Sequence, residues 1–384
     1  MMNNLNLDIA YYFTKEQCSF ERAVQEILIQ LNFGNCTPIR FVFFGTPHRS
    51  TDYYAELAIL KEKVVAKYGA KSPVISYVSQ EPLCNNSLAL EVHSIEISTV
   101  RDIQYHQFDN TQYITIEDMK SKNLSLGGAF ANNFNASIFE QSKQIFEIIK
   151  RILDKEEMPI SSIVRQWNYI SQITCINKEK QHYQEFNDAR SHFYNQSIWP
   201  SGYPAATGIG TESGGVVVDL FAVRSKGENV KLYPLDNKLQ VAAHAYSQEV
   251  LVGQEDKAFK TRTTPKFERG KVVNSLDNAL VYISGTAAIR GEGTLAETDI
   301  KKQTIITLEN IEELISISNL KEAGVEIVEP TKIKSLRIYI KAARDYEMAK
   351  MVVDKILPNV PAIYLRGDIC RDNLLIEIEG IAGN

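Results

Sequence analysis

The sequence predicts an α/β (α+β) protein in which helices pack on one face of a sheet and the unit recurs in degenerate form. Three observations support this prediction. Segments with strand character alternate with amphipathic helical segments, similar strand–turn–strand segments occur near both ends, and 384 residues exceed what one compact core usually organises. We therefore expect two domains, residues 1–159 and 160–384.

The first domain is expected to alternate strands with helices. Helices are predicted at SFERAVQEILIQLNF, ended by Gly34, at YYAELAILKEKVVAKYG, ended at Gly69, and at NASIFEQSKQIFEIIKRILDKEE, ended by Pro159. Strands are predicted at PIRFVFFGTP, SPVISYVSQEPL, LALEVHSIEI and TQYITIED. The last of these strands lies in a loop-rich stretch with a glycine turn at LGGAF.

The second domain continues the alternation. Helices are predicted near KQHYQEFNDARSHFYNQ, over 300–318 and over 345–357. Strands are predicted at GVVVDLFAV, KLQVAAHAY, ALVYISGTAAI, SLRIYIKA, AIYLRGDI and LLIEIEGIA, and residues 247–264 form a polar loop. The glycines of TGIGTESGG are predicted to be a loop. A dinucleotide fingerprint needs a helix after its glycines, and a β-branched strand follows here.

Composition narrows the function classes. The net charge of −5 argues against a nucleic-acid partner, and no apolar run is long enough to span a bilayer or to act as a signal peptide. The five cysteines form no CxxC pair, and the six histidines show no metal-ligand spacing. We expect a cytoplasmic protein with free thiols, no metal and no cofactor.

Two segments, residues 73–96 and 361–382, resemble each other. Both run from a proline through a strand, a turn with a cysteine and a second strand with a glutamate, and the cysteine precedes the glutamate by seven residues: Cys84 and Glu91, Cys370 and Glu377. FFGTP and ISGTA lie upstream of the two segments in the same order. A degenerate duplication is predicted, in which one copy holds chemistry and the other is structural.

The end of the chain resembles the Rid (YjgF-like) family over roughly residues 278–382. The residues that carry the resemblance are Ser284-Gly285-Thr286, then Asp299, Gln303, Leu308 and Asn310, then IYIKAARD and the terminal IEIEGIA. The resemblance implies a chorismate-mutase-like sheet with helices on one face.

One position departs from the Rid pattern. An ordinary Rid imine deaminase has an arginine just after the proline that corresponds to Pro361. Ala362 and Ile363 stand there in this chain, and the nearest arginine is Arg366. This departure argues against simple imine hydrolysis.

A closer resemblance is to the chorismatases, a Rid-related family with a longer N-terminal part. It covers about residues 160–384 and is carried by VRQWNYI, FNDARSHFY, PAATGIGT, PKFERG, SGTA and LRGDICRDNLLIEIEG, in that order. The longer charged loop between Tyr246 and Pro265 departs from the family. The resemblance implies chorismate as the small-molecule substrate, pyruvate release and no cofactor.

The resemblance also implies the chemistry. An acid that protonates the terminal methylene of an enol ether gives an oxocarbenium-like centre at the ether carbon. Glu377 matches the family's catalytic glutamate, and an apolar pocket would raise its pKa as this step requires. Glu379, on the same side of the strand, is interpreted as a solvated residue.

Two residues bear on the product. Cys370 matches the cysteine of family members that form hydroxybenzoate, whereas Ala287 stands where those members tend to have glycine. The prediction is 3-hydroxybenzoate. Hydrolysis to a dihydroxycyclohexadiene carboxylate, mixed 3-/4-hydroxybenzoate formation, a Rid-type enamine or imine hydrolase and a non-catalytic Rid-like binding protein are the alternatives.

Substrate carboxylates need arginine or tyrosine donors. The candidate substrate-binding residues are Arg269, Tyr246, Tyr203, Arg190 and Arg366, together with Gly285 and Ala287. Arg165 and Trp167 fit interdomain packing equally well. A monomer is predicted because an internally repeated chain can fill the subunit positions of a Rid trimer itself, with a homo-oligomer as the alternative.

Overall fold

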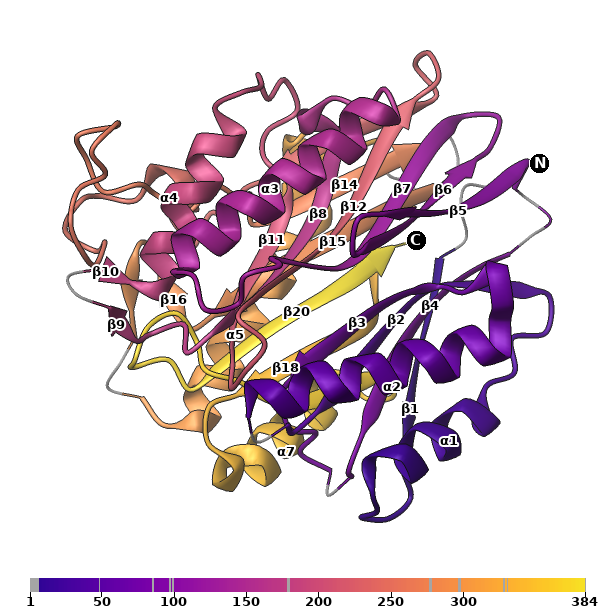
Figure 1. The fold of residues 1–384 in the computed structure, drawn as a ribbon. Helices are drawn as coiled ribbons and strands as arrows, with labels where there is room; N and C mark the ends of the chain where they lie inside the picture. The colour runs from indigo at the N-terminus through magenta and orange to yellow at the C-terminus, as the bar shows by residue number, and fades with distance from the viewer. Residues whose placement is uncertain are drawn as a thin grey trace.

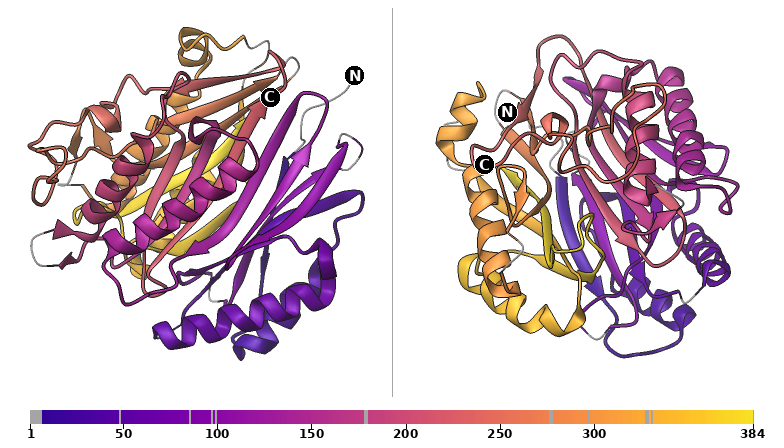
Figure 2. Two further views of the ribbon diagram at one scale, coloured as in Figure 1. Left: turned by 45° about the horizontal axis from the view of Figure 1, so that its top comes forward. Right: turned by 90° about the vertical axis from the view of Figure 1, so that its left-hand side faces the viewer.

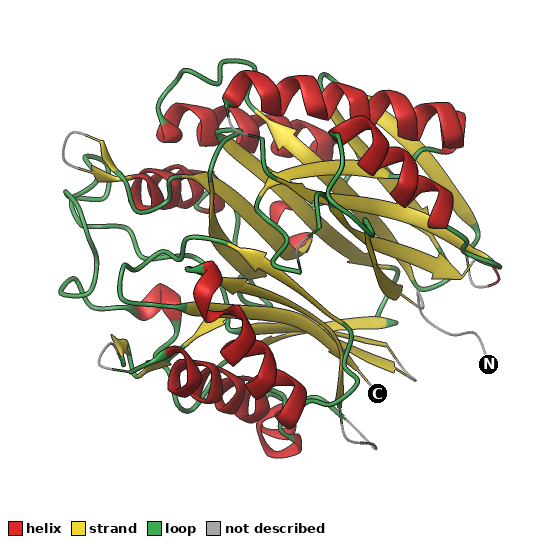
Figure 3. Ribbon diagram, turned by 90° about the horizontal axis from the view of Figure 1, so that it is seen from below, coloured by secondary structure: helices red, strands yellow, loops and turns green. Residues whose placement is uncertain are grey.

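The computed structural model describes residues 7–383 except 48, 85, 97, 99, 178–179, 276–277, 296–297, 327–328 and 330. The described residues form three units, each built on its own sheet with helices packed on it. In Figure 1 the helices lie on the outside of the molecule, and Figure 3 shows the strands of different sheets facing one another between the helical layers. The three units surround a common centre (Figure 2).

The first unit comprises residues 7–96. Its sheet has the strand order β1-β4-β2-β3, with β1 Leu7–Phe13, β2 Cys36–Gly45, β3 Val74–Ser79 and β4 Ala89–Glu96. Two helices accompany the sheet, α1 Phe20–Gln30 and α2 Ser50–Tyr68. Leu57, Leu60 and Val64 of α2 are buried and join the core of this unit.

The second unit comprises residues 102–225 and has the strand order β11-β8-β12-β7-β6-β5. Its strands are β5 Asp102–Phe108, β6 Thr111–Glu117, β7 Ser121–Phe130, β8 Ile163–Ser171, β11 Ala205–Thr211 and β12 Val216–Ser225. Its helices are α3 Ile138–Lys155 and α4 His182–Tyr194, and a short hairpin, β9 Ile176–Asn177 with β10 Lys180–Gln181, precedes α4.

The third unit comprises residues 230–383 and has the strand order β13-β14-β15-β20-β18-β19. Its strands are β13 Val230–Leu235, β14 Gly270–Ser275, β15 Asn278–Ala287, β18 Lys332–Ile340, β19 Ala362–Arg366 and β20 Ile376–Gly383. Its helices are α5 Ile300–Leu314, α6 Ile317–Glu322 and α7 Tyr346–Ile356, and β16 Ile289–Arg290 pairs with β17 Gly293–Thr294.

The expected domain boundary between residues 159 and 160 lies inside the second unit. Strands β5, β6 and β7 come from before that point and β8, β11 and β12 from after it, yet all of them belong to one sheet. We propose a division into the three units instead, because each sheet closes within one stretch of sequence.

The three units share a strand arrangement. In each, a central strand pairs with one parallel neighbour and one antiparallel neighbour: β2 with β3 and β4, β8 with β11 and β12, and β18 with β19 and β20. The segments predicted to be duplicates therefore occupy the same places in their sheets. A further copy, formed by β11 and β12, was not predicted, because its sequence lacks the cysteine and glutamate markers.

The register between units differs from the one that the sequence repeat suggested. Each central strand has one extra residue against its antiparallel partner, namely Ile39, Val164 and Lys334. When these irregularities are superposed, Glu91 corresponds to Asp219 and to Glu379. The pairing of Glu91 with Glu377 from cysteine spacing is thus off by two residues, because the strands keep the same face but not the same distance from the turn.

Other local expectations were wrong. LGGAF lies inside β7, where Gly128 has φ +62° and its Cβ position is only 2.4 Å from the Ile75 carbonyl oxygen, so the two glycines permit close strand packing. Gly208 and Gly210 lie in β11, not in a loop. KLQVAAHAY forms no strand; it contains an isolated β-bridge from Gln240 to Gly291 and the 3₁₀ turn Ala243–Ala245. Strands β5, β13 and β14 were not predicted, because their sequences are polar or short.

Candidate active site

A pocket opens where the second unit meets the third. Its walls come from α4 and β11 on one side and from β15, β20, the segment before β14 and the turn before β20 on the other, and it encloses about 820 Å³, including solvent at its mouth. A direct hydrogen bond joins the two units, since the backbone amide of Ala206 donates to the Ser284 side-chain hydroxyl at 2.9 Å. Part of the loop over 247–264, through Val250, Leu251 and Val252, covers one side.

Glu377 reaches the pocket because successive side chains of β20 point to opposite faces of the sheet. Ile376 and Ile378 pack into the core of the third unit, so Glu377 and Glu379 share the opposite face. That face is not solvated, since the exposed fractions of Glu377 and Glu379 are 5% and 2%. The interpretation of Glu379 as a surface residue was therefore wrong: the second unit covers this face of the strand.

The Glu377 carboxyl group lies against a glycine. A Cβ on Gly285 would approach Glu377 Oε1 to 2.1 Å, so any other residue at 285 would displace the carboxyl group. Among the described residues, burial and nearby charges act on this carboxyl group, and none of those groups is a hydrogen-bond partner. Burial, followed by repulsion from the Glu379 charge, raises the pKa of Glu377 to about 8. Glu377 is therefore largely protonated at neutral pH and can donate a proton.

Cys370 and Tyr183 complete this wall of the pocket. Burial and the nearby Glu377 raise the pKa of the Cys370 thiol to about 12, so the thiol stays protonated and is not a nucleophilic thiolate. Burial likewise raises the pKa of Tyr183, with a smaller contribution from Cys370. The pocket thus presents protonated groups around Glu377.

Three arginines line the pocket: Arg190, Arg269 and Arg371. Arg190 is 1% exposed and donates a hydrogen bond to the Asn187 side chain at 2.6 Å, whereas its Nε has no hydrogen-bond partner among the residues that the structure describes. Within the described part of the chain, none of the three has an ion pair with a carboxylate. Arg190 and Arg269 are buried and Arg371 is partly buried, and arginine charges without an acid are suited to bind an anionic ligand.

Arg269 is held in place by neutral partners. Its Nη2 donates to the Val241 carbonyl at 2.7 Å and to the Tyr246 hydroxyl at 2.6 Å, while its Nε finds no hydrogen-bond partner in the described part of the chain. Arg371 donates to the Glu292 carbonyl and stacks on the Tyr246 ring at 5.3 Å. Tyr246 thus orients both guanidinium groups.

The structure brings together most of the residues that the sequence singled out. Those that line the pocket are Glu377, Cys370, Arg269, Tyr246, Arg190, Gly285 and Ala287. Tyr203 is not among the lining residues; it stacks against Tyr194 outside the pocket. Arg366 is also elsewhere, half-exposed, and bridges Glu81 and Glu212 at 3.1 and 3.0 Å.

Sequence reasoning missed Tyr183, Arg371 and Gly208. Gly208 leaves room for the Tyr183 ring, which would lie 2.8 Å from a Cβ at this position. Arg371 directly follows Cys370, and Tyr183 is the second residue of the helix that holds Arg190, so their positions near the candidates that the sequence had singled out were the available signal.

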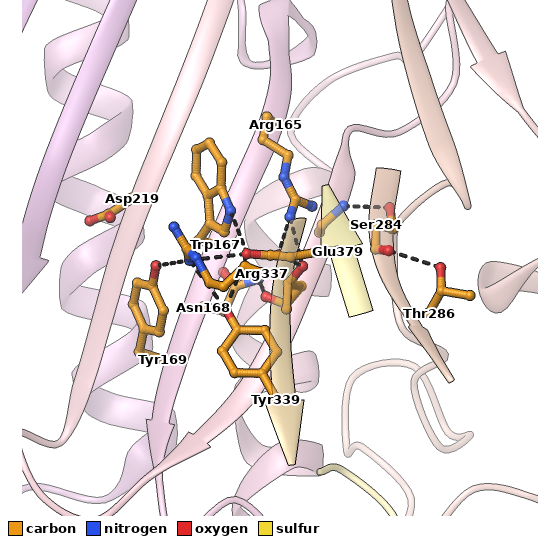
Figure 4. A network of polar contacts seen from close by, with 12 residues as sticks. Arg165, Trp167, Asn168, Tyr169, Asp219, Ser284, Thr286, Arg337, Tyr339 and Glu379 are labelled. Atoms are coloured by element: carbon orange, nitrogen blue, oxygen red, sulfur yellow. Dashed lines mark hydrogen bonds and ion pairs between the residues drawn. The ribbon is translucent and has the colours of Figure 1, made fainter. Parts of the chain in front are cut away.

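Glu379 belongs to a different environment, a buried ion-pair network behind the pocket (Figure 4). It pairs with Arg165 and with Arg337, the latter at 3.0 Å, and accepts hydrogen bonds from the Trp167 and Tyr339 side chains at 3.2 and 3.1 Å. The corresponding acids are paired too: Asp219 with Arg40 at 2.5 Å and Glu91 with Arg337 at 2.5 Å. Arg165 and Trp167 therefore connect the second unit to the third, which agrees with the interpretation of these two residues as interdomain packing.

One cluster of potential metal ligands lies among the described residues. Ligand atoms of Asp236, His244 and Glu268 are within 4.8 Å of one another, and His244 Nε2 is 3.3 Å from Glu268 Oε2. The hydrogen bond to Glu268 raises the pKa of His244, so an imidazolium can balance the two acids without an ion.

The comparisons with known proteins agree with this architecture. A model of the chorismatase FkbO/Hyg5-like N-terminal family matches residues 94–222, and a model of the endoribonuclease L-PSP family matches residues 267–383. A solved structure of a chorismatase covers 98% of both chains with a TM-score of 0.72 at 19% identity. The chain has the chorismatase fold.

Curated relatives extend the likeness to chorismatase sequences. A 3-hydroxybenzoate synthase of Streptomyces hygroscopicus is 32% identical over 59% of this chain and 65% of its own length. A chorismatase of Streptomyces rapamycinicus is 30% identical over 57% of this chain and 64% of its own length. The alignments thus span just under two thirds of these relatives. The predicted resemblance to the chorismatases is confirmed.

No described helix combines the length and apolar character that crossing a membrane requires.

Proposed function

We propose that this protein is a chorismatase that cleaves the enolpyruvyl ether of chorismate, releasing pyruvate and forming 3-hydroxybenzoate. The observation that carries the proposal is the combination of a protonated buried carboxyl group, Glu377, with buried arginines that have no acid partner, all lining one pocket. The relatives' names support it, since one is a 3-hydroxybenzoate synthase and others are chorismatases.

The residues suggest how the reaction proceeds. Chorismate carries two carboxylates, and Arg190, Arg269 and Arg371 offer separate donors for them. Glu377 gives its proton to the terminal methylene, and positive charge develops at the ether carbon. When the neighbouring ring hydroxyl displaces the ether oxygen, the bond from the ring carbon to that oxygen breaks, pyruvate leaves, and the hydroxyl loses its proton as a ring epoxide forms. The epoxide then opens, takes up a proton on oxygen and loses one from the ring carbon to become hydroxybenzoate. Pyruvate and hydroxybenzoate thus account for all atoms of chorismate without added water. If water attacks instead, one water is consumed and a dihydrodiol results.

Cys370 and Ala287 lie in the same pocket as Glu377, so both are placed to affect the product. The neutral thiol supports a role as a hydrogen-bonding or space-filling group near the ring, not as a covalent catalyst. We therefore keep 3-hydroxybenzoate as the proposed product, with the dihydrodiol or mixed hydroxybenzoates as the alternatives.

The test is direct. Purified protein is incubated with chorismate, pyruvate is followed through lactate dehydrogenase and NADH, and aromatic products are separated by liquid chromatography against 3- and 4-hydroxybenzoate standards. We expect pyruvate and 3-hydroxybenzoate in equal amounts. Pyruvate without hydroxybenzoate would indicate the hydrolase. No pyruvate above a boiled-protein control would overturn the proposal, and ammonia release from an imine substrate would then identify a Rid-type hydrolase.

The same proposal includes a monomeric, cytoplasmic enzyme. Three units already surround a common centre within one chain, which removes the need for partner subunits. All five cysteines are free, as suits a reducing compartment. Light scattering after size exclusion should give a mass near 43.4 kDa, and a trimeric mass would contradict the monomer.

A further inference from the structure

Two buried acids, Glu377 and Glu379, lie two residues apart on the same face of β20 with one arginine near both. Arg165 pairs through Nη2 with Glu379, and the same Nη2 bonds to the Thr207 hydroxyl. Its Nη1 is buried without a hydrogen-bond partner among the described residues. Arg165 thus has an unpaired N–H donor and lies near the Glu377 carboxyl group, to which it is not bonded.

We propose that Glu379 is a positioning residue that holds Arg165 in an ion pair and so keeps the guanidinium from neutralising Glu377. The inference rests on the proposed function, in which Glu377 must keep its proton. The charge on Glu379 acts in a second way, since it disfavours a second negative charge on its neighbour.

The charged and titratable groups around Glu377 come from β20 itself and from neighbouring segments of the second and third units. Arg165 of β8 and Arg269 before β14 lower the pKa of Glu377, whereas burial and Glu379 of β20 raise it. Cys370 in the turn before β20 and Tyr183 of α4 are protonated neighbours. Of the two cations, Arg269 is bonded to Val241 and Tyr246, so Arg165 is the one whose position depends on an acid.

The second unit shows the same ion pair without this consequence. Arg40 pairs with Asp219, and Ser76 donates to Asp219 at 2.7 Å, as Arg165 and Thr207 do with Glu379. The residue two positions before Asp219 is Val217, so no second acid competes there. The ion pair therefore joins units in both places but protects a neighbouring acid only at β20.

The decisive experiment compares pH profiles of kcat/KM for Glu379→Gln and the wild type. In the wild type, activity falls at high pH as Glu377 loses its proton. In E379Q we expect this basic limb to move to lower pH by about one unit or more, so that activity falls roughly fivefold at pH 8 but little at pH 6. E379D, which keeps the charge, should restore the wild-type limb. Equal loss at every pH with an unmoved limb would overturn the proposal.

The complementary variant is Arg165→Gln, which removes the competing cation. Its basic limb should move to higher pH, and the double variant E379Q/R165Q should return close to the wild type. This arm stays decisive if E379Q alone does not fold, because a basic limb in E379Q/R165Q well below that of the wild type would show that Arg165 does not compete for Glu377 and would contradict the proposal.

A readout independent of turnover separates this inference from the proposed function. Carbon-13 NMR of glutamate-labelled protein, with the Glu377 signal assigned by its absence in E377Q, follows the titration of that carboxyl group directly. A lower titration midpoint in E379Q supports the positioning role even if chorismate proves not to be the substrate. Identical midpoints in E379Q and wild type would refute the role even if pyruvate is released.

Discussion

Two interfaces of this molecule share a backbone arrangement and differ in what fills them. Where the first unit meets the second, β3 packs against β7; where the second meets the third, β11 packs against β15. When the strand registers of the two interfaces are superposed, Tyr77 at the first corresponds to Gly208 at the second. In the same way, Phe130 corresponds to Ala287 and Val217 to Glu377.

The contents of the first interface are aromatic and closed. Tyr77 stacks on Tyr53 with centroids 5.2 Å apart, Phe130 contacts Tyr54, and Val217 lies in the same hydrophobic cluster. The second interface has a glycine and an alanine at the corresponding positions and keeps a pocket. The difference teaches that the site results from removing two bulky side chains and adding one carboxyl group to an otherwise repeated junction.

The largest expected effect comes from abolishing the carboxyl group. Glu377→Gln should reduce pyruvate release from chorismate at least about a thousandfold, because the amide cannot donate a proton to carbon. The variant should remain folded, since among the described residues no hydrogen bond holds the Glu377 carboxyl group, which is influenced only by burial and nearby charges. Coupled pyruvate assays with circular dichroism check both statements. Activity within about tenfold of the wild type would reassign the acid.

Refilling the pocket is the next largest perturbation. Ala287→Phe copies Phe130 of the closed interface and should lower kcat/KM about a hundredfold or more by excluding substrate, while the thermal midpoint stays close to the wild type. The matched control is Phe130→Ala, which should cost about 2 kcal/mol of stability without a comparable loss of activity. Full activity in A287F would show that the ligand binds elsewhere.

A pH-dependent stability difference would sharpen the contrast between Glu377 and its valine counterpart. Between the unfolded pKa of about 4.3 and the folded pKa of about 8, the folded state holds a proton that the unfolded state has released. This contribution to stability is therefore lost as pH rises through that window, by up to about 1.4 kcal/mol per unit. E377Q should escape this loss and be more stable than the wild type at pH 8 but not at pH 4.5. Urea denaturation at both pH values measures it, and equal differences at both would contradict the raised pKa.

The smallest expected effect concerns product choice. Cys370→Ala keeps Glu377 and the arginines, so pyruvate release should change only a few-fold, while the share of hydroxybenzoate among the products falls. Cys175→Ala, an exposed cysteine far along the chain, is the matched control. An unchanged product ratio in C370A would leave the selection to other pocket residues.

Much of the third unit could be predicted from sequence, because β15, β18 and β20 have apolar alternation that admits one face assignment. Glu377 was found through its family motif. Glu379 was misjudged since alternation reports which residues share a face but not what covers it. The cover here is Arg165 and Trp167, more than 200 positions away in the chain.

Other features depended on contacts that no local pattern reveals. Arg366 was predicted to bind substrate, but it stands at the end of β19, where its side chain pairs with Glu81 and Glu212. Arg190, by contrast, is buried on α4 beside polar partners and faces the pocket. Arg190 stands in a predicted helix and Arg366 at the end of a predicted strand, but whether either side chain faces a pocket depends on how the helices and sheets pack.

Because the three units belong to one polypeptide, a single substitution changes one interface at a time, and the number of ligands per chain is fixed. In a symmetric homotrimer every substitution appears three times, so all interfaces change together. Here a codon change at position 287 alters one junction and leaves position 130 untouched. A chain of this kind can devote one junction to a ligand and the others to cohesion. Calorimetric titration should accordingly give one ligand per polypeptide, at a ratio that dilution does not change.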